Sequence, residues 1–327
     1  MRARLRKLSN EDDSRSHRIF PSTPPNRLGR DGIVSIVIPA FNSTATLRRA
    51  LPSILAQRDL DLVSDIVVVD SSSDGLMPDL IREYEPLGVT FIISGVGIMP
   101  AVQRNIGARA SRGELLLFLD SDVILEEDYV SKIVAFYRRG HLAGFGSVSL
   151  PPFQARKVVA VAQYYLQLSE YLPSGTPRIK PFVLGCSNFV SRELFEKAGG
   201  YPEIRAAEDV LYGHSLAALA PIWFLPEATV AHIFREDWGG YLRNQRLLGK
   251  FVARYRGDKP GGSLFKGPLL PLILFPAIIG IKAARIIPRI VGAGLGHALR
   301  CALVLPAFTV GIVFWGLGFV EEARTLK

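Results

Sequence analysis

Two pairs of carboxylates are the groups in this sequence best suited to do chemistry. Asp120 and Asp122 follow five uncharged residues, and the adjacent Glu208 and Asp209 precede a segment with helical spacing. Mg²⁺ and Mn²⁺ prefer oxygen ligands and often bind one or two carboxylates together with substrate phosphates. A carboxylate held ionised in a cleft can deprotonate a hydroxyl nucleophile. Both pairs could instead be acids at helix N-termini, so their function depends on the elements that position them.

Short apolar runs alternate with helical patterns through the first half of the chain. A helix is expected after Asn42, with Pro52 inside it at a cost in stability. A second helix is expected from Pro100, a residue well tolerated in a first turn, to Ala110. This alternation predicts an α/β fold with a parallel, doubly wound sheet and helices on both faces. The expected buried strands are residues 34–40, 65–70, 89–94 and 114–120.

Polar residues recur where these strands end. Asn42 follows the first strand, Asp70 ends the second, and Asp120 and Asp122 follow the fourth. Each could be an ordinary turn residue, but ligands bind beyond the carboxyl ends of strands in such sheets. Three strand ends with acceptor groups therefore favour one shared site. A dinucleotide-binding loop is rejected, because Pro100 replaces the third glycine of GVGIMP and removes the free amide that the loop needs.

Five motifs in chain order together resemble family-2 glycosyltransferases of the GT-A fold. They are VSIVIPAFNS, IVVVDSSSDG, QRNIGARASRGELLLFLDSD, GCSNFVSRELFEKAGGYPE and AAEDV, and the resemblance runs from about Val34 to His232. It implies a nucleotide-sugar-binding, Rossmann-like domain with a mostly parallel sheet, and an inverting transferase that uses Mg²⁺ or Mn²⁺. The donor would be a UDP- or GDP-sugar.

The resemblance also implies a role for each matching residue. Asp122 would be the direct metal ligand with Asp120 beside it, and His232 would be a further ligand, although a structural histidine is an equal alternative. Asp209, next to Glu208, would be the general base. Gly185 could equally be a bulge in a strand. Contacts to the nucleotide sugar are expected from Pro39, Ala40, Asn42, Asp70, Arg104, Asn105, Asp120, Gly185 and Asn188.

One departure from the family pattern bears on the type of reaction. Processive members, such as cellulose and hyaluronan synthases, carry a QxxRW motif after the acidic pair. The corresponding segment here reads RNQRLLGKF, with Gln245 but no Arg-Trp pair. This departure favours transfer of a single sugar over polymerisation.

The net charge of +9 is concentrated in one stretch of the chain. Gly239 to Arg300 holds eleven basic residues and one acid, beside the most apolar segments, which favours anionic lipid headgroups over nucleic acid as partners. A basic amphipathic helix suited to the membrane interface is expected over residues 241–255, with packing on the catalytic domain as the weaker alternative. The uncharged run from Cys301 to Val320 is long enough to span a bilayer and is expected to be the one true transmembrane span. The Pro-rich run 268–281 is expected to be re-entrant or interfacial, with a two-span hairpin as the rival arrangement.

These observations divide the chain into three expected parts: a disordered basic tail (1–31), a GT-A domain (32–238) and a membrane-associated end (239–327). The tail has no apolar core of a signal peptide, so the catalytic domain is expected on the cytoplasmic side of the cell membrane. The two distant cysteines fit a reducing compartment. The expected acceptor is a hydroxyl of a lipid-linked or membrane-proximal glycan. The alternatives are a polyprenyl-phosphate sugar synthase and a non-catalytic membrane scaffold of the same fold.

Overall fold

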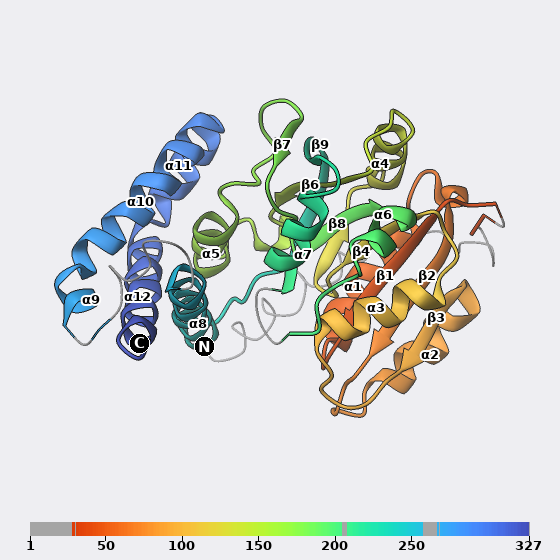
Figure 1. The fold of residues 1–327 in the computed structure, drawn as a ribbon, viewed down its shortest axis with the longest axis horizontal. Coiled ribbons are helices and arrows are strands. Elements are labelled where there is room, and N and C mark those ends of the chain that lie inside the picture. The colour runs from red at the N-terminus through yellow and green to blue at the C-terminus, as the bar shows by residue number, and fades with distance from the viewer. Residues whose placement is uncertain (1–27, 30, 205–207, 258–266, 268, 327) are drawn as a thin grey trace, which may run out of the picture.

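The computed structural model describes residues 28–29, 31–204, 208–257, 267 and 269–326, so most of the predicted tail lies outside the described residues. A nine-stranded sheet runs in the order β3-β2-β1-β4-β8-β6-β9-β5, with β7 paired to β9 (Figure 1). The strands are β1 (Val34–Ala40), β2 (Val63–Asp70), β3 (Val89–Ile93), β4 (Leu115–Leu119), β5 (Val123–Leu125), β6 (Ala143–Ser149), β7 (Arg178–Lys180), β8 (Ser187–Ser191) and β9 (Ile222–His232).

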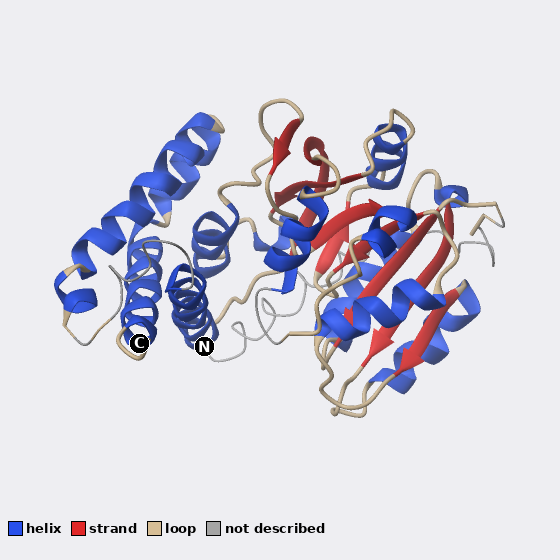
Figure 2. Cartoon of the chain, viewed as in Figure 1, coloured by secondary structure: helices blue, strands red, loops and turns tan. Residues whose placement is uncertain are grey.

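Helices cover the sheet and then form a separate layer at one end of the molecule (Figure 2). Those around the sheet are α1 (Thr44–Leu55), α2 (Met77–Tyr84), α3 (Pro100–Ala110), α4 (Tyr129–Tyr137), α6 (Arg192–Lys197) and α7 (Glu208–Ala217). Those towards the other end are α5 (Val158–Leu168), α8 (Trp238–Gly257), α9 (Leu270–Ile273), α10 (Phe275–Gly292), α11 (Leu295–Leu303) and α12 (Leu305–Ala323).

The four strands and two helices predicted from apolar runs are all present, as β1 to β4, α1 and α3. Every residue of β1 and β4 is buried, as continuous apolar strands between helical layers should be. Asp70, Asp120 and Asn42 therefore lie where predicted, at or just beyond the carboxyl ends of parallel strands β1, β2 and β4.

The prediction of a mostly parallel sheet is wrong for the second half of the sheet. Among the described strands, four pairings are parallel (β1–β2, β2–β3, β1–β4, β6–β9) and four are antiparallel (β4–β8, β6–β8, β5–β9, β7–β9). The antiparallel half begins where β8 enters beside β4. Its strands have weak sequence signals, because β5 and β7 have three residues each and β6 contains two glycines.

Helices α8 and α12 pack lengthwise through glycines. A Cβ atom on Gly249 would lie 1.9 Å from the carbonyl oxygen of Trp315, and one on Gly318 would lie 1.9 Å from that of Arg246. Small residues let two helix backbones approach this closely. The face of α8 buried in this contact carries Tyr241, Gln245, Gly249, Ala253 and Gly257, whereas the predicted apolar face of Leu248, Phe251, Val252 and Tyr255 is only half-buried.

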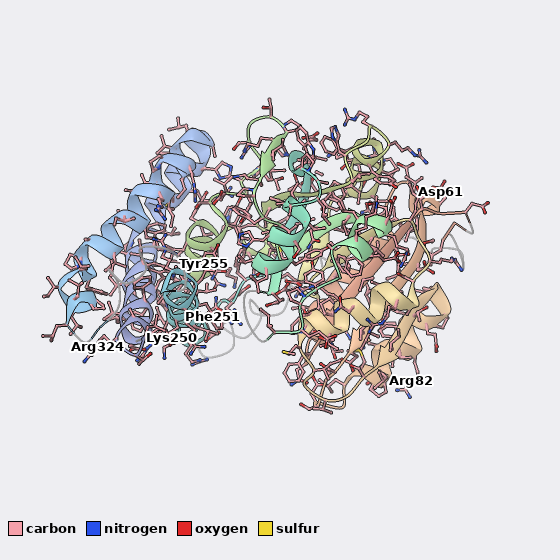
Figure 3. The ribbon with its side chains drawn as sticks, in the orientation of Figure 1. Asp61, Arg82, Lys250, Phe251, Tyr255 and Arg324 are labelled. Atoms are coloured by element: carbon pink, nitrogen blue, oxygen red, sulfur yellow. The ribbon has the colours of Figure 1, made fainter. Side chains whose placement is uncertain are left out.

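The basic side of α8 also meets α12. Arg246 and Lys250 pair with Glu321, and Arg254 pairs with Glu322. Figure 3 shows Lys250, Phe251 and Tyr255 on α8 near Arg324, at the opposite end of the molecule from Asp61 and Arg82. Part of the predicted basic face is therefore neutralised within the protein.

Helix α12 is the single described helix that is long and apolar enough to cross a bilayer, with a mean hydropathy of 1.3 over its best window, but half of that window is buried inside the protein. Helices α9 to α11 carry many exposed apolar side chains. We call this surface the apolar face; it includes Leu272, Ile273, Ile281, Ile287, Val291 and Leu295.

Candidate active site

The loops after β1 and β2 are bonded to each other by the polar residues that end these strands. Asn42 has a φ of 48°, a left-handed conformation that asparagine tolerates better than most residues. Its Oδ1 accepts a hydrogen bond of 2.9 Å from the amide of Ser73. Asp70 is buried, and its Oδ1 accepts hydrogen bonds from the amide and hydroxyl of Ser72 at 3.2 and 2.5 Å. Asn42 and Asp70 thus belong to one loop cluster, as predicted.

Gln103 on α3 supports this loop cluster through hydrogen bonds to the strand ends. It was not among the predicted site residues. It is buried in α3, and its Nε2 donates to the carbonyl oxygens of Ala40 at 2.8 Å and Val69 at 2.7 Å. The ends of β1 (Pro39–Ala40) and β2 are thereby held in register. The available signal was its position, because Gln103 directly precedes Arg104 in the segment that carried the family resemblance.

Arg104 joins the two acidic pairs. The buried guanidinium lies with Nη2 2.6 Å from Asp120 Oδ1 and Nη1 3.6 Å from Glu208 Oε1. It also lies over the ring of Tyr201, 5.1 Å from its centroid. Burial alone would lower the pKa of Arg104, but Asp120, Tyr201 and Glu208 raise it above its ordinary value, so the cation is permanent. Residues far apart in sequence are therefore held together by one buried charge.

The side-chain amides of Asn105 and Asn188 both form hydrogen bonds with Tyr201. Asn105 donates to the Tyr201 carbonyl and accepts from the Tyr201 amide, each at 2.9 Å. Asn188 is fully buried in β8 and donates to the Leu184 carbonyl at 3.1 Å and to the Tyr201 hydroxyl at 3.0 Å. The structure places both asparagines as supports for Tyr201, beneath the site rather than in its wall. Tyr201 itself was not predicted, because a tyrosine in a Gly-Gly-Tyr-Pro turn carries no chemical signal.

Asp122 and His232 lie side by side although 110 positions separate them. Val123, next to Asp122, pairs with His232 across β5 and β9, which brings His232 Nε2 within 3.5 Å of Asp122 Oδ1. Asp122 Oδ1 and His232 Nδ1 are buried and have no hydrogen-bond partner among the described residues. Burial raises the pKa of Asp122; His232 opposes this rise and Asp120 adds to it. A carboxylate kept short of partners in this way is costly unless a cation binds it.

A hollow that we call the acidic cavity is lined by His232, whereas Asp122 is not part of its lining. Its volume is about 470 Å³, and its lining includes Asp120, Gly185, Cys186, Asp209 and His232. A Cβ atom on Gly185 would lie 2.9 Å from Asp209 Oδ2, so glycine at this position leaves room for the carboxylate. The alternative, in which Gly185 is only a strand bulge, does not explain this contact. Asp120, Asp209 and His232 are thus brought together, while Asn188 is not part of the lining.

Asp209 lies in a surrounding that makes its carboxylate more basic than usual. It lies in the first turn of α7, where its Oδ1 accepts a 2.8 Å hydrogen bond from the amide of Val210. Burial, and after it the charge of Glu208, raise the pKa of Asp209 above its ordinary value. A carboxylate with a raised pKa binds a proton more readily than an ordinary one.

The comparisons with known proteins agree with this architecture. A mannosyltransferase from Pyrobaculum calidifontis, solved with GDP-mannose and Mn²⁺, superposes with a TM-score of 0.55 over 89% of this chain and 86% of its own, at 21% identity. The validoxylamine A glucosyltransferase of Streptomyces hygroscopicus subsp. limoneus is 33% identical over 32% of this chain and 23% of its own length. The succinoglycan biosynthesis protein ExoO of Rhizobium meliloti is 33% identical over 31% of this chain and 28% of its own.

The chain therefore matches about a quarter of the length of these curated relatives. The sequence model of glycosyl transferase family 2 matches residues 35–199, which is half of the chain and includes β1 to β4, Arg104, Asp120 and Asp122. With its fold and this match together, the chain belongs to glycosyl transferase family 2 and has the GT-A fold.

Proposed function

We propose that this protein is an inverting glycosyltransferase that moves one sugar from a UDP- or GDP-sugar to a hydroxyl of a lipid-linked or membrane-proximal glycan, with Mg²⁺ or Mn²⁺ as cofactor. The observation that carries the proposal is the acidic cavity, whose wall holds Asp120, Asp209 and His232 together. The GDP-mannose and Mn²⁺ of the Pyrobaculum mannosyltransferase support this donor class and cofactor in the same fold.

Asp122 and His232 are the residues that would hold the divalent cation. The described residues contain no group of three or more acidic, histidine or cysteine side chains able to hold a metal. A pair of ligands suffices where substrate phosphates supply the rest, and an imidazole beside a carboxylate oxygen suits Mn²⁺. When bound, the cation would neutralise negative charge on the departing diphosphate.

Asp209 would perform the proton transfer. The acceptor hydroxyl loses its proton to the Asp209 carboxylate while its oxygen bonds to the anomeric carbon. The bond from that carbon to the nucleoside diphosphate breaks on the opposite face, so the configuration inverts. Arg104 would hold Asp120 and Glu208 in place around the reacting groups through the buried ion pairs at 2.6 and 3.6 Å.

A panel of nucleotide sugars tests the proposal. UDP- and GDP-sugars are added with and without Mn²⁺, and thermal unfolding and release of nucleoside diphosphate are followed. A ligand that binds only the folded state raises the melting temperature. We expect one sugar nucleotide to stabilise the protein in a metal-dependent manner and to be slowly hydrolysed. If no member of the panel does either, the proposed function fails.

Glu208→Gln should move the pH profile of activity to lower pH. The negative charge of Glu208 raises the pKa of Asp209, whereas Arg104 lowers it. The substitution removes the first charge and frees Arg104 from one of its two carboxylates, so both effects lower the pKa of Asp209. Because the base must be ionised, the rising limb of kcat/KM against pH shifts towards acid.

The exposed Glu203 supplies the matched control for this measurement, because Glu203→Gln removes the same charge from the surface five positions away. Glu203→Gln should leave the rising limb where it is. A limb that stays unmoved in Glu208→Gln would assign the titrating base to another residue.

We further assign the transfer reaction to residues 32–238 and attachment to an anionic membrane surface to residues 239–327. The attachment we propose is interfacial rather than spanning. A spanning α12 would carry α8 with it, and α8 holds Arg246, Lys250 and Arg254 alongside the C-terminal half of α12, where they pair with Glu321 and Glu322. Charged residues are expensive in hydrocarbon, whereas an interface accepts them.

A vesicle flotation experiment tests the interfacial attachment. The protein should float with anionic vesicles in a density gradient and be released from them by alkaline carbonate. Retention on the vesicles after carbonate treatment would indicate a true span.

A further inference from the structure

A second cavity adjoins the acidic cavity, on the side of the C-terminal helices. It has a volume of about 240 Å³ and lies between α5, α8, α10 and α12. We call it the basic cavity, because Arg256, Lys282, Arg285 and Arg289 line it. The two cavities share six lining residues, namely Leu166, Gln167, Tyr171, Val252, Lys282 and Trp315. One ligand could therefore reach from one cavity into the other.

The charge in the basic cavity is not balanced within the protein. Glu170 is its acidic lining residue, and it already pairs with Lys180 at 2.8 Å and Arg289 at 3.1 Å. Arg256, Lys282 and Arg285 form no ion pair in the part of the chain that the structure describes. A cluster of cations held together without counter-charge is a costly arrangement, which an anionic ligand would stabilise.

Lys282 lines both cavities. It is half-buried, and its Nζ lies 4.0 Å from the ring centroid of Trp315. Burial, and after it the charge of Arg256, lower the pKa of Lys282 to about 7. Near it, Gln167 Nε2 is buried and has no hydrogen-bond partner among the described residues. Lys282 and Gln167 thus both line the basic cavity and can donate hydrogen bonds to a ligand there.

The other side of the basic cavity opens towards the apolar face. Ile281 lines the cavity and is also half exposed on that face, together with Ile273 and Ile287. From Lys259 to Val320 the sequence has no acidic residue. The order across the molecule is therefore a carboxylate at Asp209, then a cluster of cations, then an acid-free apolar surface.

From this order we propose that the basic cavity binds the phosphate groups of a lipid-linked acceptor, with the acceptor sugar in the acidic cavity and the lipid chain along the apolar face. The assignment rests on the proposed function, because it needs Asp209 to face the acceptor hydroxyl. It adds to that function the class of acceptor, a glycan joined to a long-chain alcohol through phosphate. Lys282, Arg256 and Arg285 are the residues that would recognise the phosphate.

Direct binding tests the proposal without the natural acceptor. The full chain is saturated with Mn²⁺ and with UDP or GDP, whichever nucleotide stabilises it, so that the donor site is occupied. Farnesyl diphosphate is then titrated by calorimetry, with inorganic diphosphate and farnesol as separate arms. We expect farnesyl diphosphate to bind at least tenfold more tightly than either, because it alone carries both phosphate and lipid.

Three variants locate the binding. Lys282→Met keeps a flexible apolar stem beside Trp315 but removes the charge, and Arg256→Gln and Arg285→Gln remove cations from the same cavity. Each substitution should weaken the binding of farnesyl diphosphate at least tenfold. Arg300→Gln removes an exposed cation from α11 that lines neither cavity, and it should change nothing.

The alternative outcomes each overturn the proposal in a distinct way. Equal weakening by Arg300→Gln would assign the binding to general surface charge. Equally tight binding of inorganic diphosphate would make the site one for a free anion. A matching loss of nucleotide affinity in Lys282→Met would place Lys282 in the donor site. Failure of every nucleotide to bind would reject the proposed function, while the farnesyl diphosphate titration would still decide what the basic cavity holds.

Discussion

Asp209→Asn should lower the kcat of sugar transfer by about 10²- to 10⁴-fold, the range expected when a positioned general base is lost. The amide has the shape of the carboxylate but cannot accept the acceptor proton. Equal size matters here, because a Cβ placed on Gly185 would already lie 2.9 Å from Asp209 Oδ2, so the site has little spare room. Steady-state rates with a saturating donor give kcat, and thermal stabilisation by the nucleotide gives donor affinity, which should stay within about twofold of wild type.

Asp79→Asn is the matched control for this experiment. Asp79 also lies in the first turn of a helix, but it is exposed and pairs with Arg82 one turn further along that helix. The control separates loss of a helix-terminal charge from loss of the base. Wild-type turnover in Asp209→Asn would reject the assigned role, and so would an equal loss of turnover in Asp79→Asn.

The parallel half of the fold could be predicted from sequence because its signals are local. Strands β1, β2 and β4 are rich in Val, Ile and Leu, and α3 begins at a proline suited to a first turn. The antiparallel half could not be predicted in the same way. Strand β8 is the five residues Ser-Asn-Phe-Val-Ser, and its place beside β4 depends on long-range pairing of Asn188 with Phe118.

The same distinction holds for the candidate site. Carboxylates at strand ends, such as Asp70 and Asp120, could be predicted from the pattern of strands alone. The residues that support the site from neighbouring elements could not be predicted in this way. Gln103 and Tyr201 act through backbone carbonyls and amides that only the folded chain brings within reach. The contact between Asp122 and His232 depends on the register of β5 against β9, and no sequence period encodes that register.

The C-terminal helices show that a helix predicted to contact a membrane can also be held by contacts within the protein. Periodicity identified α8 as an amphipathic helix, and it is one. Glycine ranks as a helix-weakening residue in isolation, so the packing role of Gly249 was hidden. Gly249 packs against the backbone of α12, and the cations Arg246 and Arg254 meet Glu321 and Glu322 at the same helix.

Asp122→Asn should separate folding stability from function. Burial raises the pKa of Asp122, so the folded state disfavours its ionised form. A group whose pKa is raised on folding costs stability at pH values above that pKa, because the charge must be buried. Removing the charge should therefore keep or raise the melting temperature of the metal-free protein at neutral pH. Turnover with Mn²⁺ should nevertheless fall about a hundredfold or more, since a bound metal supplies several kcal/mol at the leaving group.

The measurement is a titration of nucleoside diphosphate release against Mn²⁺, paired with melting temperatures in the presence and absence of Mn²⁺ and nucleotide. In the wild type the metal and nucleotide should stabilise the protein together, and in Asp122→Asn that joint gain should disappear. Asp128→Asn is the control, because Asp128 is a half-exposed carboxylate paired with Lys132 at 2.8 Å. If Asp122→Asn has a higher melting temperature but no longer responds to Mn²⁺, the buried charge of Asp122 costs stability and serves metal binding. A variant that keeps the full Mn²⁺ response would mean that the cation binds elsewhere, and the pairing of Asp122 with His232 would then be only structural.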